Sequence, residues 1–269
     1  KDTSRYEAYL ERCEDFNKFY IKTGFKELDE IIGGWDRQEE LATIAARTNM
    51  GKYWVLLKCA TAALEQGLKV GIYSGEMSAR KVGYRVDTIL SHIPNRGLVK
   101  GDRQYQNQYK AYLDSLGKYQ GELKVLTPND IGGPAGVNAL RAFIEKYNLD
   151  ILFVDQHSLL EDERRGRSQQ EKAYNISKDI RILQNLIKKP VICVSQMNRE
   201  KNESDPDSIS LDQIANSSGI GNDSTLVLGI SRDKNDHNII KIQIVKSRDT
   251  GEVGKTLTYY ADLNLGTLK

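Results

Sequence analysis

The chain has 269 residues, of which 39% are hydrophobic and 28% are charged, and its net charge is +2. This composition is typical of a globular protein that buries a full core, and no apolar run approaches the roughly 20 residues that cross a bilayer. The charge neither requires nor excludes nucleic acid, so such binding needs a local patch. The three cysteines and three histidines lack metal-ligand spacing, and the cysteines are typical of reduced thiols in a cytosolic protein.

The amino-terminal segment has the pattern of an amphipathic helix. Between residues 4 and 20, apolar side chains recur at helical spacing from Tyr6 to Tyr20, and charged residues fill the other faces. Two interpretations are open at this stage. The helix either packs on its own domain or forms an arm that docks on a neighbouring subunit.

Strands and helices then alternate along the chain. A short helix ends at Gly33-Gly34, and apolar runs predict strands at 41–46, 69–74, 123–127, 150–155 and 191–196. Helical patterns separate these runs, at about 52–66, 79–93, 102–117, 136–147 and 168–188. Three strand-like runs close the chain, at 225–232, 238–248 and 255–261. The order predicts an α/β fold with a mainly parallel sheet and an antiparallel flank.

The stretch TIAARTNMGKYW, residues 43–54, has part of a phosphate-binding loop pattern. The usual motif is Gly, four residues and then Gly-Lys-Ser/Thr, between a strand and a helix. Only Gly51-Lys52 is intact here. The predicted strand and helix around it would still direct backbone N–H groups and the helix dipole at phosphates. The candidate nucleotide-binding residues are Ala46, Arg47, Thr48, Asn49, Met50, Gly51, Lys52 and Tyr53.

Polar residues follow three of the other predicted strands. Asp155 ends the strand ILFVD, where a carboxylate can hold a Mg²⁺-bound water, and Gln196 ends VICVSQ, where an amide can contact a terminal phosphate. Glu76 follows KVGIYS and could activate a water for attack on that phosphate. Each residue alone is also compatible with an ordinary solvated strand end or helix start. Together with the loop, in this order, they favour a nucleotide site.

The motifs KTGFKELDEIIGG, IAARTNMGK, SGEMS with a later Arg85, ILFVD, VICVSQMNRE and KSRDTG resemble those of DnaB-type replicative helicases, in the same order. The resemblance runs from about residue 22 to 262 and covers the RecA-like motor domain of that family. It implies a linker or docking helix over 1–21 and a RecA-like P-loop ATPase domain over 22–269. The divergent letters resemble phage-borne copies, which implies a location in the cytosol, that of a bacterial host if the chain is phage-encoded.

The resemblance also implies a role for each candidate. Lys52 would bind the β- and γ-phosphates of ATP, Asp155 would hold the Mg²⁺ shell, and Glu76 would be the general base. Gln196 would couple the γ-phosphate to loops that bind DNA. Lys246 and Arg248, in KSRDTG, match finger residues that act on ATP held by the neighbouring subunit of a hexamer. The pair is otherwise compatible with two charges that face water at a sheet edge.

Two stretches are candidates for contact with single-stranded DNA. One contributes Arg164, Arg165 and Arg167, although a solvated charge run would look the same. The other contributes Asn216, Ser217, Ser218 and Gly219, just after Ala215, which replaces an Arg of the family pattern. Hydroxyl and N–H groups can hold phosphates without a formal charge, so we expect a shallower salt dependence than for an Arg-lined pore.

Tyr53 departs from the family pattern most sharply. It stands where a Ser or Thr hydroxyl would ligate Mg²⁺, and a phenol hydroxyl lies too far from the backbone to take that place. The sequence therefore leaves two functions open. One is a hexameric, ATP-driven helicase motor on single-stranded DNA, with a helicase loader and a primase as possible partners and no membrane. The other is a degenerate ATPase that serves as a replisome scaffold or loader-binding module. A RecA-like recombinase or signalling ATPase fits SGEM and SQMNR less well.

Overall fold

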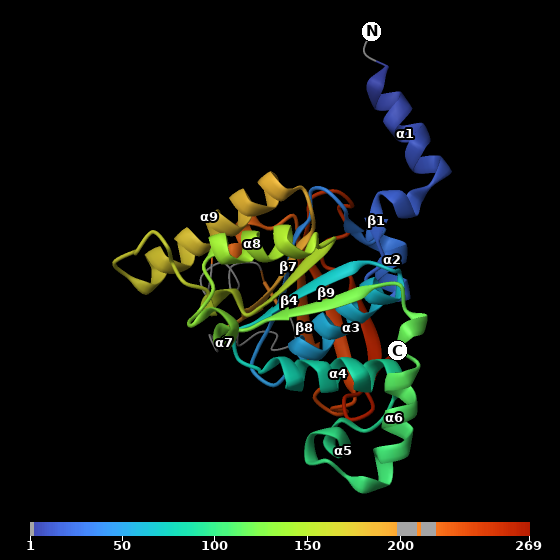
Figure 1. Cartoon of the computed structure of the whole chain (residues 1–269). Helices are drawn as coiled ribbons and strands as arrows, with labels where there is room; N and C mark the ends of the chain where they lie inside the picture. Colours follow the sequence, from blue (N-terminus) through green and yellow to red (C-terminus); the bar gives the residue numbers. More distant parts are fainter. Residues whose placement is uncertain (1–2, 198–208, 211–218) are drawn as a thin grey trace.

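A twisted sheet of nine strands runs through the described part of the chain, which in this computed structural model comprises residues 3–197, 209–210 and 219–269 (Figure 1). The strand order is β11-β10-β9-β8-β3-β7-β6-β4-β5. The strands are β3 (Leu41–Ala46), β4 (Lys69–Ser74), β5 (Glu122–Leu126), β6 (Ile151–Asp155), β7 (Val191–Gln196), β8 (Leu226–Arg232), β9 (Ile239–Ser247), β10 (Thr256–Asp262) and β11 (Thr267–Leu268). The strands from β8 to β5 are parallel, and β9, β10 and β11 are antiparallel. The predicted α/β class with an antiparallel flank is confirmed.

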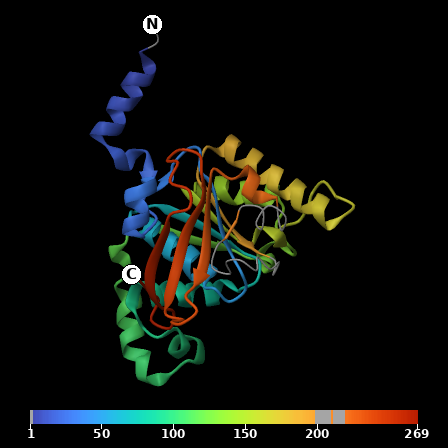
Figure 2. The same ribbon diagram turned by 180° about the vertical axis from the view of Figure 1, so that it is seen from behind.

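Helices cover both faces of the parallel strands, as Figures 1 and 2 show from opposite sides. Alternate residues of one strand point to opposite faces, so Phe153 packs into the core under α3 (Lys52–Glu65) and α4 (Ala79–Ser91). Val154 packs instead under α8 (Val137–Tyr147) and α9 (Gln169–Ile187). Burial on both faces explains why these strands read as continuous apolar runs.

The remaining elements are short and lie around this framework. They are α2 (Lys26–Ile32), α5 (Asn95–Lys100), α6 (Gln106–Asp114), α7 (Pro128–Ile131), α11 (Ile220–Asp223), β1 (Tyr20–Ile21), β2 (Trp35–Asp36) and the single turns η1 (Phe16–Lys18), η2 (Arg103–Tyr105), η3 (Leu116–Lys118) and η4 (His157–Leu159). Gly33, with φ of 83°, ends α2 as its sequence predicts. The expected helix over 102–117 is shorter than predicted. Gly101, at φ of 67°, ends α5, and Asp102 then starts the separate turn η2 before α6 begins.

The amino-terminal helix α1 (Ser4–Glu14) projects away from the domain (Figure 1). None of its residues is buried, and Tyr6 is 64% exposed. The interpretation of a helix packed on its own domain is therefore wrong. The helix is also shorter than predicted, because Asp15 has φ of −143° and its carboxylate accepts the N–H of Lys18 to start η1. Among the described residues, none of the helices has both the length and the apolar content to span a bilayer.

Candidate nucleotide site

Four parallel strands end on the same side of the sheet. We call this line of carboxyl ends the carboxyl edge, and the line of the opposite strand ends the amino edge. Ala46 of β3 is level with Gln196 of β7, and Ser74 of β4 is level with Asp155 of β6. The loop 47–51 leaves β3 at this edge and leads into α3. Four candidate residues that were predicted from separate parts of the sequence all lie at this edge: Lys52, Glu76, Asp155 and Gln196. They come together because neighbouring parallel strands end on the same side of the sheet.

The loop turns back through two left-handed residues. Asn49 has φ of 63° and Gly51 has φ of 90°, conformations that Asn and Gly adopt most readily. The carbonyl of Gly51 accepts the N–H of Trp54 at 2.9 Å and so starts α3. The first N–H groups of this 14-residue helix therefore face the loop and the strand ends, which is the arrangement that binds phosphates.

The ammonium of Lys52 is held by amide oxygens at the centre of this edge. It donates to Gln196 at 3.2 Å and to Gln156 at 3.5 Å. The Gln196 amide in turn donates to the Thr48 hydroxyl of the loop at 3.3 Å. Partial burial lowers the pKa of Lys52, while Asp155 and Glu76 oppose that shift. Lys52 is thus hydrogen-bonded to neutral amide oxygens at two strand ends, and a charged phosphate oxygen would be a stronger acceptor than either.

Two carboxylates face this lysine. Asp155 is only 3% exposed, and burial together with the charge of Glu76 raises its pKa to about 7, although Lys52 and Arg85 act in the opposite direction. Glu76 itself is exposed at the mouth of the site. The negative charge of a buried carboxylate beside a second acidic group is only partly offset by nearby cations. Carboxylate oxygens are also the ligands that a hard divalent cation prefers. The donor set therefore fits Mg²⁺.

Tyr53 is buried at the start of α3, and its phenol lies close enough to Asp155 and Ser74 at the strand ends to interact with them. Its ring is buried, and the guanidinium of Arg85 lies 5.0 Å from the ring centroid and 5.2 Å from that of Trp54. Burial raises the pKa of the Tyr53 phenol, with a further contribution from Asp155. Within the described chain its hydroxyl has no hydrogen-bond partner of ordinary geometry. A buried aromatic ring thus occupies this helical position, and no short hydroxyl stands there.

Two further residues belong to this site and were missed in the sequence. Gln156 follows Asp155 directly, is 9% exposed and accepts from Lys52. Arg232 ends β8 beyond the level of Ala46, and a side-chain carbon at Gly51 would lie 3.6 Å from its guanidinium. Gln156 could have been found as the next polar residue after a strand. Arg232 could not, because its approach to the loop depends on the strand order.

The predicted finger residues lie at the amino edge, where the parallel strands begin. Ser247 pairs with Leu226, which pairs with Ala42 at the start of β3. The four residue steps from Ala42 to Ala46 span about 13 Å at the usual rise of a strand. Arg248 follows Ser247, is exposed, and is paired with no carboxylate in the described chain. It therefore lies far from the phosphate loop of its own subunit.

Lys246 differs from Arg248 in its environment. Its ammonium is half-buried and donates to the carbonyls of Gly221 at 3.0 Å and Asn222 at 2.8 Å, at the end of α11. Burial and the nearby Arg248 lower its pKa. The interpretation of both residues as edge charges that face water is wrong for Lys246, which holds α11 in place.

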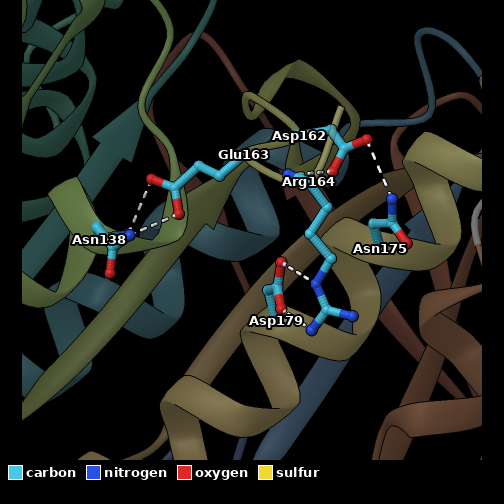
Figure 3. Close-up of polar contacts among 6 residues, drawn as sticks. All are labelled: Asn138, Asp162, Glu163, Arg164, Asn175 and Asp179. Carbon is cyan, nitrogen blue, oxygen red and sulfur yellow. Dashed lines mark hydrogen bonds and ion pairs between the residues drawn. The ribbon is translucent and has the colours of Figure 1, made fainter. Parts of the chain in front are cut away.

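The arginine-rich loop before α9 is folded onto its own domain (Figure 3). Arg164 forms an ion pair with Asp179 of α9, and Asp162 accepts the N–H of Gly166 at 2.6 Å and the amide of Asn175 at 3.2 Å. Glu163 accepts from Asn138 at 2.8 Å. The guanidinium of Arg164 is thus engaged in the chain itself.

The structure describes some of the other predicted DNA contacts but not all of them. Arg165 and Arg167 are exposed, which leaves them accessible to a ligand. Gly219 has φ of 70° and precedes α11. Asn216, Ser217 and Ser218 lie outside the described residues.

The family model of the DnaB-like helicase C-terminal domain matches residues 20–264. The chain belongs to this family. The matched residues include the loop, the acidic strand end and the KSRDTG stretch, so the resemblance inferred from the motifs is confirmed.

Curated relatives agree with this assignment. The chain is 28% identical over 220 residues to the replicative DNA helicase DnaB of Helicobacter pylori (strain ATCC 700392 / 26695), which covers 79% of this chain and 43% of the relative. It is 27% identical over 247 residues to DnaB of Geobacillus stearothermophilus, covering 87% of this chain and 53% of the relative. The chain thus spans about half the length of the curated relatives it matches.

Solved structures share the fold. One of them, described as an ATPase domain, superposes with a TM-score of 0.82 at 21% identity, over 100% of this chain and 99% of that one. A DnaB-like replicative helicase, described with its interactions with primase, superposes with a TM-score of 0.83 at 19% identity, over 100% of this chain and 66% of that one. At such identities the likeness concerns the RecA-like architecture alone.

Proposed function

We propose that this domain is the ATP-hydrolysing motor of a ring-shaped replicative DNA helicase, which moves on single-stranded DNA and separates duplex. The observation that carries the proposal is the placement of the nucleotide loop and Arg248 at opposite edges of one sheet. A chain built in this way cannot complete its own site. Copies arranged head to tail can do so, and closure of such an arrangement gives a ring.

The phosphates of ATP would bind to the loop N–H groups and the start of α3. Lys52 would exchange its two amide partners for β- and γ-phosphate oxygens, because a charged acceptor forms the stronger hydrogen bond. Arg232, beside Gly51, is a further candidate contact for the nucleotide. The release of Gln196 from Lys52 would then report the presence of the γ-phosphate to the chain that follows β7.

Asp155 would hold Mg²⁺, whose charge would offset the negative charge that develops on the transferred phosphoryl group. Asp155 needs to be ionised for this role, and a bound cation would favour that form. Glu76 is exposed at the mouth of the site, where it could take a proton from the attacking water.

Arg248 would act on the nucleotide of the neighbouring subunit. A guanidinium that forms no ion pair among the described residues is available for this, and such fingers contribute on the order of 10³-fold or more to hydrolysis. Since Lys246 is held by α11, we assign it to the support of this edge, with Arg248 as the finger. The exposed aromatic side chains of α1 would dock on the neighbouring subunit and help to close a hexamer.

Single-stranded DNA would pass along the loops at the carboxyl edge, with Arg165 and Arg167 on its phosphates. Six copies of such contacts give affinity with little sequence preference, as a motor requires. A primase is a further candidate partner, since a structural neighbour is described with its interactions with primase.

The test is Mg²⁺-dependent ATP hydrolysis across protein concentration, with and without single-stranded DNA. We expect turnover to rise with both, and to be lost in Lys52→Ala. Turnover that is independent of concentration would contradict a site shared between subunits. If neither the parent chain nor Tyr53→Thr hydrolyses ATP, the scaffold function stands in place of the motor. The burial of Tyr53, which leaves no short hydroxyl at its position, is the observation that keeps that second candidate.

A further inference from the structure

A buried carboxylate lies at the edge that carries Arg248. Glu40 precedes β3 and is 7% exposed. One carboxylate oxygen accepts the hydroxyl of Thr225, and the other accepts the N–H of Asp36 at 3.4 Å. No lysine or arginine of the described chain forms an ion pair with it. A carboxylate buried in this way is costly, so its presence calls for a reason beyond filling space.

Formation of the sheet does not require this side chain. The ladder contact of residue 40 is made by its backbone carbonyl, which accepts the N–H of Val191 at 3.0 Å. Any residue would supply that carbonyl. The one proton of the Thr225 hydroxyl can go to Glu40 or to the carbonyl of Leu41 at 3.0 Å, and an ionised carboxylate is the stronger acceptor. The carboxylate thus orients this hydroxyl, whose oxygen accepts the N–H of Leu41 at 3.0 Å.

Thr225 is the residue that holds the base of the finger. Its N–H donates to Leu41 at 2.8 Å, and its carbonyl accepts the N–H of Arg248 at 3.1 Å. Arg248 lies just beyond β9, where regular pairing ends at Ser247. The backbone from which the guanidinium extends is therefore held by Thr225, and the side chain of Thr225 is held by Glu40.

The acidic surroundings argue against a purely structural role. Asp36 and Asp249 lie close enough to raise the pKa of Glu40, which burial raises most, to about 7. A buried acidic group beside two others lowers stability when it ionises, so stability alone does not explain Glu40. A carboxylate at this position is explained if Thr225 has to be held in one orientation so that the guanidinium of Arg248 can reach another subunit.

We propose that Glu40 is a positioning residue for Arg248, which acts through Thr225 to hold the end of β9 in the orientation that reaches the nucleotide of the neighbouring subunit. The inference rests on the proposed function, because it assumes that Arg248 works across the subunit boundary. It predicts that the loss of Glu40 impairs the finger of the subunit that carries the change and leaves the nucleotide loop of that subunit intact.

Mixed rings separate these two effects. A Lys52→Ala subunit has an intact finger and no working loop, and an Arg248→Ala subunit has the reverse. An equimolar mixture should hydrolyse ATP faster than either variant alone, since one subunit supplies the finger and the other the loop. The finger donor is then changed further, to Lys52→Ala with Glu40→Leu, which has no acceptor, or with Thr225→Val. Thr225→Ser, which keeps the hydroxyl, is the matched control.

We expect rescue to fall about tenfold or more with Glu40→Leu and with Thr225→Val, which both remove the side-chain hydrogen bond, because small misplacements of a catalytic group are costly, and to persist with Thr225→Ser. Ring assembly by light scattering and binding of a fluorescent ATP analogue should be unaltered when Glu40→Leu is made in the otherwise unchanged chain. Full rescue by the Glu40→Leu donor in assembled rings would overturn the proposal. So would loss of rescue together with loss of assembly, which would assign Glu40 to stability.

The failure of the proposed function gives a different result. If the parent mixture of Lys52→Ala and Arg248→Ala shows no rescue, the finger does not act across subunits. Both inferences then fall together. If that mixture is active and all donors rescue equally, only the role of Glu40 is wrong.

Discussion

The two edges of the sheet treat charge in opposite ways. At the carboxyl edge, Lys52, Asp155 and Glu76 lie within reach of one another, and each shifts the ionisation of another. At the amino edge, Arg248 has no acidic partner in the described chain, while the nearby carboxylate of Glu40 is committed to Thr225. The carboxyl edge has the charged groups of a ligand-binding site. The amino edge has a cation that is suited to complete the site of another subunit. Changes at the two edges should therefore alter different steps.

The largest effect should come from the amino edge. Arg248→Ala should lower ATP turnover by about 10³-fold, because it removes the charge that stabilises the transition state. Nucleotide affinity should change little, because a finger acts on charge that develops in the transition state, while the loop residues that hold the bound nucleotide are unchanged. Steady-state hydrolysis and equilibrium binding measure the two quantities. Lys52→Ala is the matched control at the other edge and should lose binding as well; equal losses of binding in both variants would remove the contrast.

Acid should weaken ligand binding at the carboxyl edge. The pKa of Asp155 is about 7 in the free protein, so below that pH a proton must leave before a cation binds. The dissociation constant for Mg²⁺-nucleotide should then rise by up to about tenfold per pH unit below about pH 7. Calorimetric titration between about pH 5 and 8 measures it. Asp155→Asn should bind weakly with a flat profile, and a flat profile in the parent chain would contradict the assignment.

Tyr53 gives a test in which stability and function move apart. Tyr53→Thr removes a buried ring and its stacking on Arg85, so unfolding should become easier by about 3 kcal/mol. The same change restores a short hydroxyl at the helix start, and Mg²⁺ should bind more tightly. Urea unfolding and Mg²⁺-dependent turnover report the two effects. Tyr53→Phe is the control for the ring, since it keeps the ring and should leave both measurements near the parent; loss of stability without any gain in Mg²⁺ affinity would argue that the site is not a motor site.

Glu40 should make the domain less stable as the pH rises. Its pKa is about 7 in the folded protein against a usual value of 4.5. Between those values the carboxyl holds its proton only in the folded state, so its stabilising contribution is complete below the lower value and is lost as pH rises through the upper one. The loss is about 3 kcal/mol. Urea midpoints across this range should decline less steeply in Glu40→Gln than in the parent chain, and parallel profiles would refute the shift.

The smallest effect should separate the arginines of the loop before α9. Arg165→Ala and Arg167→Ala should each reduce the salt dependence of single-stranded DNA binding by about one charge, because their side chains are exposed. Arg164→Ala should change that slope less, since its guanidinium is paired with Asp179. Fluorescence anisotropy at several salt concentrations measures the slopes. A larger change for Arg164 than for the other two would reverse the assignment made from Figure 3.

Much of the nucleotide site was predictable because its signals are local. Apolar runs of strand length ended by Asp155 or Gln196, and Gly51-Lys52 between a strand and a helix, are readable within a few residues. The amino-terminal helix shows the limit of such signals. Its spacing predicted a helix through Tyr20, but Asp15 ends it early, and spacing alone could not tell a packed helix from a projecting one.

The sequence by itself determined the alternation of strands and helices, the strand-end residues and the family to which the chain belongs, because each depends on short-range patterns. The tertiary structure alone decided which of these residues meet. Glu40 and Thr225 are 185 positions apart, and Lys52 and Gln196 are 144 apart. Such contacts depend on strand order and register, which arise from packing across the whole sheet. For the same reason only the fold could place Arg248 at the edge opposite its own loop.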